Sequence, residues 1–575
     1  MDDSCLNLFG SGGKITPQIA WSFYQNGLNF NNQINLDATV KSNENFYIGK
    51  QWEGVQSNGL PTPQFNIIKR VVNFSVATIT TDSVKVNATA LANTPDTGSL
   101  AEPVRIVNEE FEALNEANNV SSLLREFARN AAVDGDGCLY TYWDTEADAG
   151  YGKKGAVRTE IIGNTRVIFG NPNDRLVQSQ PYIQIVKRDI ARNTRKRAKE
   201  NGSTDWDGIT PDSDSSNATD EAKYTDDKVT VLLTLWRDDE DGEIHAFEST
   251  QNCIVKNPYS LGIRLYPICW LCWDYIQDCY HGQAMVTGLI PNQIFINKAY
   301  AMSMLSMMRT SFPKIIYDRT RISGWDNRVG GAIPVNGGDI NSVARIIDPA
   351  SISPQISQFI QMAIEETEQS LGATSVALGD TRPDNTSAIL ALQRAASTPA
   401  EITKQNLYRA TEDLFRIYLE FMAANYGRRM VDMEPPKELH EAAEWSGTTL
   451  PDEITLEFDF DMLKSLPMAL KLDVGASSYY SEIASMQTLD ALLQAGHINI
   501  VQYLERIPDY TVPGKRALIN EKRQELKMQM QAVQPQENQT PKTFMGGTNH
   551  EIKGGSGYGS LQRQINRTGS TEGLI

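Results

Sequence analysis

The segment from 282 to 310 is the feature that most constrains how this chain can fold. Its sequence, GQAMVTGLIPNQIFINKAYAMSMLSMMRT, predicts one helix roughly 40 Å long, with a bend expected at Pro291. A helix of that length is long for a globular core. A mostly non-helical stretch, 311–350, separates it from a second predicted helix, 353–371, which has Ser353 as its N-cap and Pro354 in its first turn.

Methionines crowd the end of the first long helix. Met302, Met304, Met307 and Met308, together with Leu305, make it apolar around most of its circumference. Such a helix can be buried in the core of its own subunit. Alternatively, it can pack against identical helices in a ring, where pliable methionine side chains tolerate small sliding motions. Periodicity does not separate these two interpretations.

Composition indicates a folded, soluble protein of several parts. At 575 residues the chain exceeds one compact core, and size scaling predicts roughly two to four domains or one extended subunit. Its formal net charge of -18 argues against a protein that grips DNA phosphates over its whole surface. Six cysteines do not make a disulfide framework and no secretory signal begins the chain, which favours a reducing compartment. No apolar run approaches the ~20 residues of a membrane span.

The first 280 residues are predicted to be α+β. From Val40 on, an aromatic helix end is followed by a Gly/Pro-rich loop and by a helix that runs into a strand. Residues 107–131 are predicted to form one helix, acidic and then amphipathic. Alternating apolar residues predict strands at 137–146, 159–172, 182–190, 229–239 and 243–249.

Between these strands, residues 192–228 are Ser/Asp-rich with few apolar side chains, which predicts an exposed insertion or linker. Its basic cluster could touch nucleic acid, but a solvated helix end near acidic neighbours is the favoured interpretation. The cluster consists of Arg192, Arg195, Lys196, Arg197 and Lys199.

After the second long helix a turn-rich strip leads into another helix, capped by Thr386 or Ser387 and predicted to run to Gly427 with a kink at Pro399. A strand is predicted at 453–463. Helices are predicted at 478–496, 498–506 and 514–531. The Gln/Asn/Gly/Ser-rich end, 532–575, is predicted to be disordered unless a partner orders it.

No residue pattern supplies an enzyme's chemistry. The closest approach to a phosphate-binding loop, LFGSGGKIT, has Leu8 where the first glycine belongs and Ile15 where a hydroxyl belongs. Glu457, Asp459 and Asp461 alternate along a predicted strand and could hold two divalent ions, as in a nuclease. A solvated strand face is favoured, because apolar residues fill the other side.

Metal sites and cofactors are not predicted. Cys269 and Cys272 form a lone CxxC with no second ligand pair, and buried thiols are the favoured interpretation. Asp134 and Asp136 resemble a fragment of a calcium loop whose other ligands are missing, so a turn is favoured. The histidines are scattered without metal-binding spacing: His245, His281, His440, His497 and His550.

Several motifs follow one another in a characteristic order: NENFYIGKQWEG, GLPTPQFNIIKRVVNFSV, GLIPNQIFINKAYAMSM, FPKIIYD, GGAIPVNGGD, ATSVALGDTRPDNTSAILALQRAAS and DFDMLKSLPMALKLDVGASSYYSEIASMQTLDALLQAG. In this order they resemble the portal proteins of tailed double-stranded DNA bacteriophages, especially those of short-tailed phages. The first two resemble the N-terminal signature, the third resembles the first stem helix, and the next two the clip strands. The sixth is similar to the tunnel loop followed by the long kinked wing helix. The seventh is similar to the wing strand followed by a helical region. The resemblance covers roughly residues 40–530.

The resemblance implies an α+β, mainly helical subunit with wing, stem, clip and crown, assembled as a ring around a central channel. The implied parts are the wing (1–281, with an exposed insertion at about 192–228), stem helix 1 (282–310), the clip (311–350), stem helix 2 (351–371), the tunnel loop (372–388), the second part of the wing (389–475), the crown (476–531) and a polar tail (532–575). Because the helix predicted to end near 531 gives way to that tail, no long helical barrel is predicted after the crown.

Portal proteins form a ring, usually of twelve subunits, at one capsid vertex of the virion, through which double-stranded DNA is packaged and ejected. They catalyse nothing themselves and need no cofactor. The partners implied for this chain are other copies of itself, the terminase large subunit, a tail adaptor protein, the major capsid and scaffolding proteins, and DNA bound without sequence specificity. Assembly in the host cytoplasm is also implied.

The resemblance also implies roles for individual residues. In the tunnel loop, Arg382, Asn385, Thr386 and Ser387 would touch DNA lightly while Asp380 and Asp384 limit adhesion. In the stem, Gln293, Asn297, Met304 and Met308 would pack, and in the clip Lys314, Arg319, Arg321, Trp325 and Arg328 would dock partners. An ordinary exposed hairpin remains an alternative for the clip residues. The alternatives for the whole chain are a metal-dependent, terminase-like nuclease and another structural head-to-tail connector.

Overall fold

A computed structural model describes residues 15–90 apart from 58 and 83, 101–212 apart from 149 and 151, 227–310, 314–324, 332–347, 354–369, 400–433, 454–474 apart from 467, 479–507, and positions 512, 515, 518, 519, 521 and 522. The chain forms two compact units, Met1–Ile483 and Ala484–Ile575.

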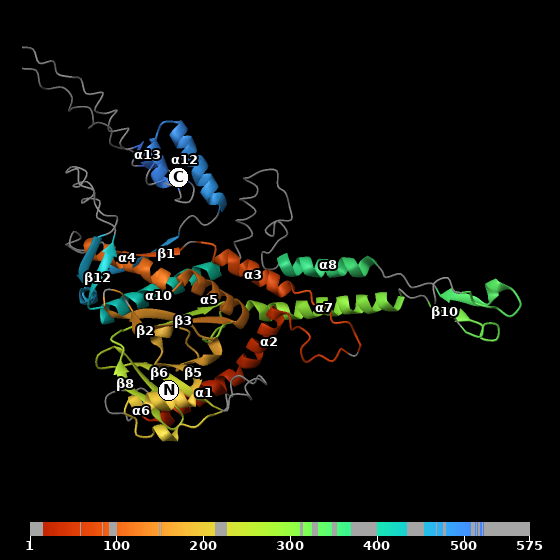
Figure 1. The fold of residues 1–575 in the computed structure, drawn as a ribbon, viewed down its shortest axis with the longest axis horizontal. Coiled ribbons are helices and arrows are strands. Elements are labelled where there is room, and N and C mark those ends of the chain that lie inside the picture. Colours follow the sequence, from red (N-terminus) through yellow and green to blue (C-terminus); the bar gives the residue numbers. More distant parts are fainter. Residues whose placement is uncertain are drawn as a thin grey trace, which may run out of the picture. The chain divides into compact units, whose positions relative to one another are not determined.

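Helices and antiparallel sheets alternate in the first unit (Figure 1). Its helices are α1 (Pro17–Gln33), α2 (Leu36–Ile48), α3 (Ile67–Ile79), α4 (Ala101–Ala117), α5 (Val120–Asp134), α6 (Ala191–Glu200), α7 (Met285–Thr310), α8 (Pro354–Gln369) and α10 (Glu401–Asn425). Its strands are β1 (Val84–Ala90), β2 (Asp136–Asp148), β3 (Lys154–Ile161), β4 (Val167–Phe169), β5 (Tyr182–Ile190), β6 (Lys228–Arg237), β7 (Ile244–Ser249), β8 (Ile254–Ser260), β9 (Ile268–Cys272), β10 (Lys314–Tyr317), β11 (Ala344–Ile347), β12 (Arg428–Met433), β13 (Ile454–Asp459) and β14 (Met468–Val474).

The strands form a five-stranded sheet in the order β4-β5-β6-β7-β8, a three-stranded sheet in the order β3-β2-β9, and the pairs β1-β14, β10-β11 and β12-β13. Every pairing is antiparallel. The α+β class predicted for this part of the chain is confirmed. The predicted succession of helix, Gly/Pro-rich loop, helix and strand is likewise confirmed, by α2, α3 and β1.

The main core lies between the helices α3, α5 and α10 and the three-stranded sheet. α5 buries Phe127, Ala128 and Ala131 completely, at the spacing of one helix face. α10 buries Leu414 and Tyr418 in the same way, and the Tyr418 hydroxyl shares a 2.8 Å hydrogen bond with Thr159 of β3. The core is therefore assembled from segments that lie hundreds of residues apart in sequence.

The prediction of a single helix over 107–131 is wrong. α4 ends at Ala117 and α5 begins at Val120, because Asn119 adopts the left-handed conformation with φ of +49°. Asparagine tolerates that conformation better than most residues. The Asn118 side chain supports the break, since its Nδ2 donates to the carbonyls of Leu114 and Val157 at 3.1 Å.

Most of the described residues of 192–228, the segment predicted to be an exposed insertion, are exposed, but three of its side chains are buried. α6 packs on the five-stranded sheet and buries Thr194 and Ala198, while Ile209 joins the same small core. The basic cluster of α6 faces acidic neighbours as interpreted: Arg197 pairs with Asp189 at 3.3 Å and with Glu248 at 3.6 Å. Small side chains on the buried face of α6 explain why this face has so little hydrophobic signal.

The second unit contains most of α12 (Tyr479–Gln494) and α13 (Ile500–Arg506), which lie where helices were predicted. Asn499 caps α13 with a full capping box, in which its Oδ1 accepts from the Gln502 amide at 2.8 Å and Gln502 Oε1 accepts from the Asn499 amide. The hydroxyl of Tyr503 on α13 donates to Asp490 on α12. The predicted 514–531 helix and the 532–575 tail lie largely or wholly outside the described residues.

Candidate functional site

The helix α7 confirms the predicted long helix within three residues at its start, and its first half is bound firmly into the first unit. Gln293 is 1 % exposed, and both polar atoms of its side chain make hydrogen bonds. Its Oε1 accepts from the Ile67 amide at 3.0 Å, and its Nε2 donates to the Phe65 carbonyl at 2.7 Å and to Asn297 Oδ1 at 2.9 Å. One turn of α7 is thereby fixed to the start of α3.

Asn297 continues this network toward α2. Its Nδ2 donates to Gln51 Oε1 at 2.7 Å, and both side chains are buried. Nearer the start of α7, the fully buried Asn43 of α2 donates from Nδ2 to Thr287 Oγ1 at 3.0 Å. Amide side chains are hard to bury unless hydrogen-bonded. Their pairing therefore fixes the rotation and register of α7 against α2 and α3.

The motif NENFYIGKQWEG supplies contacts in other directions as well. Glu44 accepts two hydrogen bonds from Arg129 of α5, at 2.5 and 2.7 Å. The Tyr47 ring lies 4.9 Å from the same guanidinium, and its hydroxyl donates to Asn73 of α3 at 2.9 Å. This motif is thus the point at which α2 holds α3, α5 and α7 together.

Asp134 lies at the edge of this cluster, with Oδ2 4.0 Å from Arg129. Burial, followed by the negative charge of Glu44, raises the pKa of Asp134 to about 7, and Arg129 opposes the rise. A protonated Asp134 removes the repulsion between the two carboxyl groups. The charge state of this corner therefore changes near neutral pH.

A buried Asp–His pair stands immediately before α7. His281 Nδ1 lies 2.7 Å from Asp136 Oδ2, and both side chains are almost completely buried. Asp136 Oδ1 accepts from the Gly282 amide at 2.7 Å. A Cβ on Gly135 would lie 2.7 Å from the Gly282 carbonyl oxygen, so the backbones touch here. The start of α7 is consequently tied to the α5–β2 turn.

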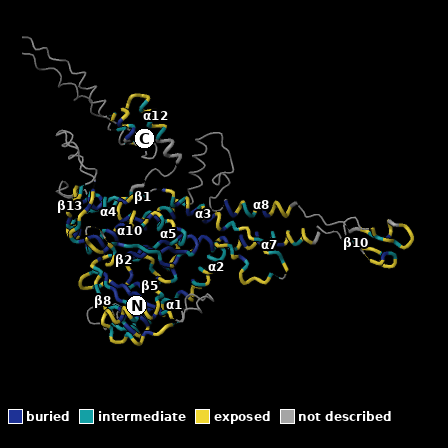
Figure 2. Tube along the Cα trace, viewed as in Figure 1, coloured by how far each residue is buried: buried dark blue, intermediate teal, exposed yellow. Residues whose placement is uncertain are grey.

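The second half of α7 has a different environment (Figure 2). Met302, Met304 and Met308 are 64, 40 and 61 % exposed. The interpretation of this methionine-rich part as a helix buried in its own subunit is therefore wrong. Of the residues proposed for stem packing, Gln293 and Asn297 are buried within the subunit, whereas Met304 and Met308 face outward.

α8 runs antiparallel to α7, since Asn292 Nδ2 donates to Thr367 Oγ1 at 3.3 Å and Phe295 packs edge-on against Phe359 at 5.7 Å. Figure 1 shows the two helices side by side. α8 also carries exposed apolar side chains, namely Ile356, Phe359 and Met362. An apolar surface therefore extends over both helices of the predicted stem.

The predicted clip contains the β10-β11 pair, in which Lys314 is opposite Ile347 and Tyr317 opposite Ala344. Arg319 is exposed, and Arg321 donates from Nη1 to Ser342 Oγ at 3.3 Å. Trp325 and Arg328 lie outside the described residues.

The whole tunnel strip lies outside them too. Its proposed residues Asp380, Arg382, Asp384, Asn385, Thr386 and Ser387 therefore have no described position, nor does the predicted kink at Pro399.

The carboxylates proposed for a nuclease do not share one strand. β13 ends at Asp459, and Asp461 lies in the following 3₁₀ helix, so the strand predicted over 453–463 is too long. Asp459 pairs with Arg428 at 3.2 Å and its Oδ1 accepts from the Asp461 amide at 3.2 Å. Glu457 is exposed, which agrees with the favoured solvated face.

The cysteine interpretation is confirmed for Cys269, which is 2 % exposed and whose thiol pKa is raised by burial. Cys272 is partly buried, and its Sγ lies 3.4 Å from the Tyr280 carbonyl. The turn favoured at Asp134 and Asp136 is confirmed, with Gly135 at φ of +103°. Sequence reasoning missed the partner of Asp136, because 145 residues separate it from His281.

Part of the chain matches a known protein family. Residues 190–431 match the model of the family described as phage P22-like portal protein, a range that contains α6, β6 to β11, α7, α8 and α10. A search among curated proteins finds no match. Within the described residues no helix combines the length and the apolar character needed to cross a membrane.

The portal family is structural rather than enzymatic, and it supports a head-to-tail connector role at the capsid vertex of a virion. The network around Asn43 and Gln51 lies before the matched range, while its partners Gln293 and Asn297 lie inside it. The resemblance of this chain to the portal proteins of short-tailed, P22-like bacteriophages is thereby confirmed.

Proposed function

We propose that this chain assembles into a closed ring, of twelve copies, through which double-stranded DNA enters the capsid during packaging and leaves it at infection. In this proposal α7 and α8 form the stem that surrounds the channel. The segment 311–350 is the clip, residues 372–388 reach into the channel, and the helices after 476 form the crown. The ring docks the terminase large subunit first and a tail adaptor later.

The observation that supports the proposal most is the exposed apolar surface of α7 and α8. Single apolar side chains on a surface need no explanation, but contiguous ones are typical of an interface. Here four methionines of α7 and three apolar residues of α8 are exposed on two neighbouring helices, within the range that matches the portal family. A second copy of the chain in a ring would remove both surfaces from water.

Charge supports the role of a conduit. Each lysine or arginine that neutralises a DNA phosphate adds affinity by counterion release, and such affinity would slow a moving duplex. A subunit with a formal net charge of -18 has little tendency to hold DNA over its whole surface. Light contacts from Arg382, Asn385, Thr386 and Ser387, moderated by Asp380 and Asp384, fit this requirement.

The clip would dock the partners through basic and apolar side chains. Arg319 and Ile316 are exposed, the latter by 60 %, and Arg321 is half-exposed. Arginine and aromatic residues are enriched at protein interfaces, and Tyr317, Trp325 and Arg328 belong to the same segment.

Ring formation is tested by replacing Met302 and Met308 together with aspartate. Charges placed on a face that must pack against a neighbouring copy carry a large desolvation cost, so the double variant should remain monomeric. Native mass spectrometry and negative-stain imaging of the purified chain measure the assembly directly. The wild type should give a ring, and its mass fixes the number of subunits.

The matched control is Met462→Asp, because Met462 is 51 % exposed but lies on the 3₁₀ helix after β13. It should assemble like the wild type. A wild-type chain that is monomeric under all conditions contradicts the proposal, as does a double variant that still forms rings.

The channel strip is tested by replacing residues 372–388 with a shorter linker. Rings should still form, since the stem surfaces are untouched, while packaging or retention of DNA should be impaired. Normal packaging with the shortened strip would show that these residues do not act on DNA.

A further inference from the structure

The turn between β6 and β7 gathers acidic residues around one histidine. Its sequence from 237 to 245 is RDDEDGEIH, with five carboxylates between positions 238 and 243. The turn is closed by main-chain hydrogen bonds: the Asp238 amide donates to the Glu243 carbonyl at 2.9 Å, and the Gly242 amide to the Asp238 carbonyl at 3.0 Å. Gly242, at φ of +69°, allows this tight closure.

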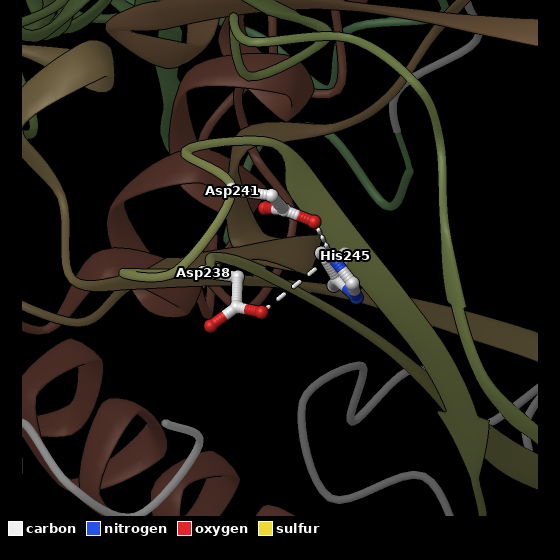
Figure 3. A group of neighbouring side chains, drawn as sticks. All are labelled: Asp238, Asp241 and His245. Carbon is white, nitrogen blue, oxygen red and sulfur yellow. Dashed lines mark hydrogen bonds and ion pairs between the residues drawn. The ribbon is translucent and has the colours of Figure 1, made fainter. Parts of the chain in front are cut away.

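Three side chains of this turn converge (Figure 3). His245 Nε2 lies 3.0 Å from Asp241 Oδ2 and 3.8 Å from Asp238 Oδ2. One ligand atom from each residue lies within 4.8 Å of the others. The separations are close to those between ligand atoms around one small cation, whose bonds to oxygen and nitrogen are about 2.0 to 2.2 Å long.

His245 and Asp241 have contacts outside this group of three side chains, and Asp238 is placed by the main chain of the turn. His245 stands opposite Trp236 in the β6–β7 register, with ring centroids 5.6 Å apart. Asp241 Oδ1 accepts from the Glu243 amide at 2.8 Å, which turns Oδ2 toward the imidazole. Asp238 begins the turn, which is closed by the main-chain hydrogen bonds between Asp238 and Glu243 and between Gly242 and Asp238. The arrangement is therefore fixed before any ligand binds, apart from small side-chain movements.

The negative charge of the turn is poorly balanced by its surroundings. The adjacent Arg237 is directed elsewhere, because its guanidinium donates to the carbonyls of Gln178 at 3.2 Å and Arg264 at 3.1 Å. Among the described residues, only His245 lies within ion-pair distance of Asp238 or Asp241. A cation at this position would offset the mutual repulsion of the carboxylates.

We propose that Asp238, Asp241 and His245 bind a divalent transition-metal ion of the zinc or manganese class. An imidazole nitrogen combined with two carboxylate oxygens suits such ions, whereas calcium and magnesium prefer oxygen ligands alone. The bound ion would cross-link the two ends of the turn at the tip of the five-stranded sheet. This site lies in the range that matches the portal family but does not depend on ring assembly.

The test is a calorimetric titration of the untagged full-length chain with Zn²⁺, compared with His245→Gln and Asp241→Asn. Loss of one of three ligands should weaken binding by about tenfold or more, since even second-sphere partners of a metal cost 10- to 100-fold. Two variants that differ in size and charge guard against misfolding of either one, which circular dichroism checks. Co²⁺ absorption serves as an independent readout, because nitrogen and oxygen ligands give no thiolate charge-transfer band.

Asp239→Asn is the matched control, since it removes one negative charge from the same turn without touching the three residues. It should change the Zn²⁺ affinity by less than about twofold. The proposal is overturned if the wild type binds no Zn²⁺ or Co²⁺, if Asp239→Asn weakens binding as much as Asp241→Asn, or if Co²⁺ shows thiolate ligation.

Discussion

The two halves of α7 are made of the same kind of helix but meet opposite environments. The first half buries Gln293 and Asn297, whose hydrogen-bond partners Phe65, Ile67 and Gln51 belong to the same subunit. The second half exposes methionines to solvent in the same subunit. The first half thus buries amides beside apolar residues such as Val286 and Ile296, whereas the second half exposes apolar side chains of a kind that is usually buried.

This contrast separates two tasks along one helix. Buried amides have few satisfactory arrangements, so they fix the orientation of α7 on the first unit. Exposed methionines have many arrangements of similar energy, so they suit a surface that another copy covers and that must tolerate small shifts. Changes in the first half should therefore affect the stability of the isolated subunit, and changes in the second half its assembly.

The largest effect on stability is expected for Asp136→Ala, which removes the partner of His281 and of the Gly282 amide at the entry to α7. The buried His281 Nδ1 and the Gly282 amide then lack a hydrogen-bond partner, and we expect a loss of about 4 kcal/mol in the free energy of unfolding. Urea unfolding of unassembled subunits measures it. Asp148→Ala, on the exposed end of the same strand, should cost less than about 0.5 kcal/mol. Equal losses would show that the pair does not anchor the helix.

Gln293→Ala is expected to cost somewhat less, about 3 kcal/mol. It leaves the Ile67 amide, the Phe65 carbonyl and Asn297 without their partner and opens a small cavity. The comparison is with Gln361→Ala on α8, whose exposed side chain only donates to Glu365 and should lose less than about 0.5 kcal/mol. If both variants unfold at the same urea concentration, the network does not hold the first half of α7 in place.

The long helix could be predicted from sequence because a continuous apolar pattern of that length has few other solutions. Its start was placed at 282 and lies at Met285. The break between α4 and α5 could not be predicted from the sequence, since Asn118 and Asn119 continue a helical pattern and only the φ of Asn119 interrupts it. The buried face of α6 could not be predicted either, because it is filled by alanine and threonine rather than by large apolar residues.

The environment of α7 was even harder to predict from local sequence patterns. The methionines of α7 were recognised, but their periodicity fits a core and an interface equally well, and exposure alone separates the two. The partners of Gln293 lie 225 to 228 residues away, and those of Asp136 lie 145 or 146 residues away. Such pairs depend on tertiary packing, which local patterns do not encode.

A smaller effect should appear as pH dependence in the anchored part of the first unit. Burial raises the pKa of Asp134 and of Glu110 from their ordinary values of 3.8 and 4.5 to about 7. Between the unfolded and folded pKa values the folded state binds more protons, so stability falls as the pH rises from about 4 to 7. The wild type should lose stability between pH 5 and pH 8. In Asp134→Asn and in Glu110→Gln, the decrease in the free energy of unfolding over this range should be smaller than in the wild type by about 1 to 2 kcal/mol.

Unfolding of wild type and variants at pH 5, 6, 7 and 8 measures this difference. Asp144→Asn is a suitable control because Asp144 lies in β2 and its Oδ1 accepts from the nearby Glu146 amide at 3.1 Å. A difference between Asp134→Asn and wild type that is independent of pH would show that Asp134 titrates at its ordinary pKa in the folded chain.

The smallest effect is expected for Met308→Ser, and it tests the other half of the comparison. Met308 is 61 % exposed, so its loss should change the unfolding free energy of the subunit by less than about 0.5 kcal/mol. The same change should weaken assembly, because the methionine would be buried only against a neighbouring copy. Unfolding of monomers and the concentration dependence of ring formation measure the two effects separately. A variant that destabilises the monomer as much as Gln293→Ala does would place Met308 in the core of its own subunit and remove the distinction between the two halves of α7.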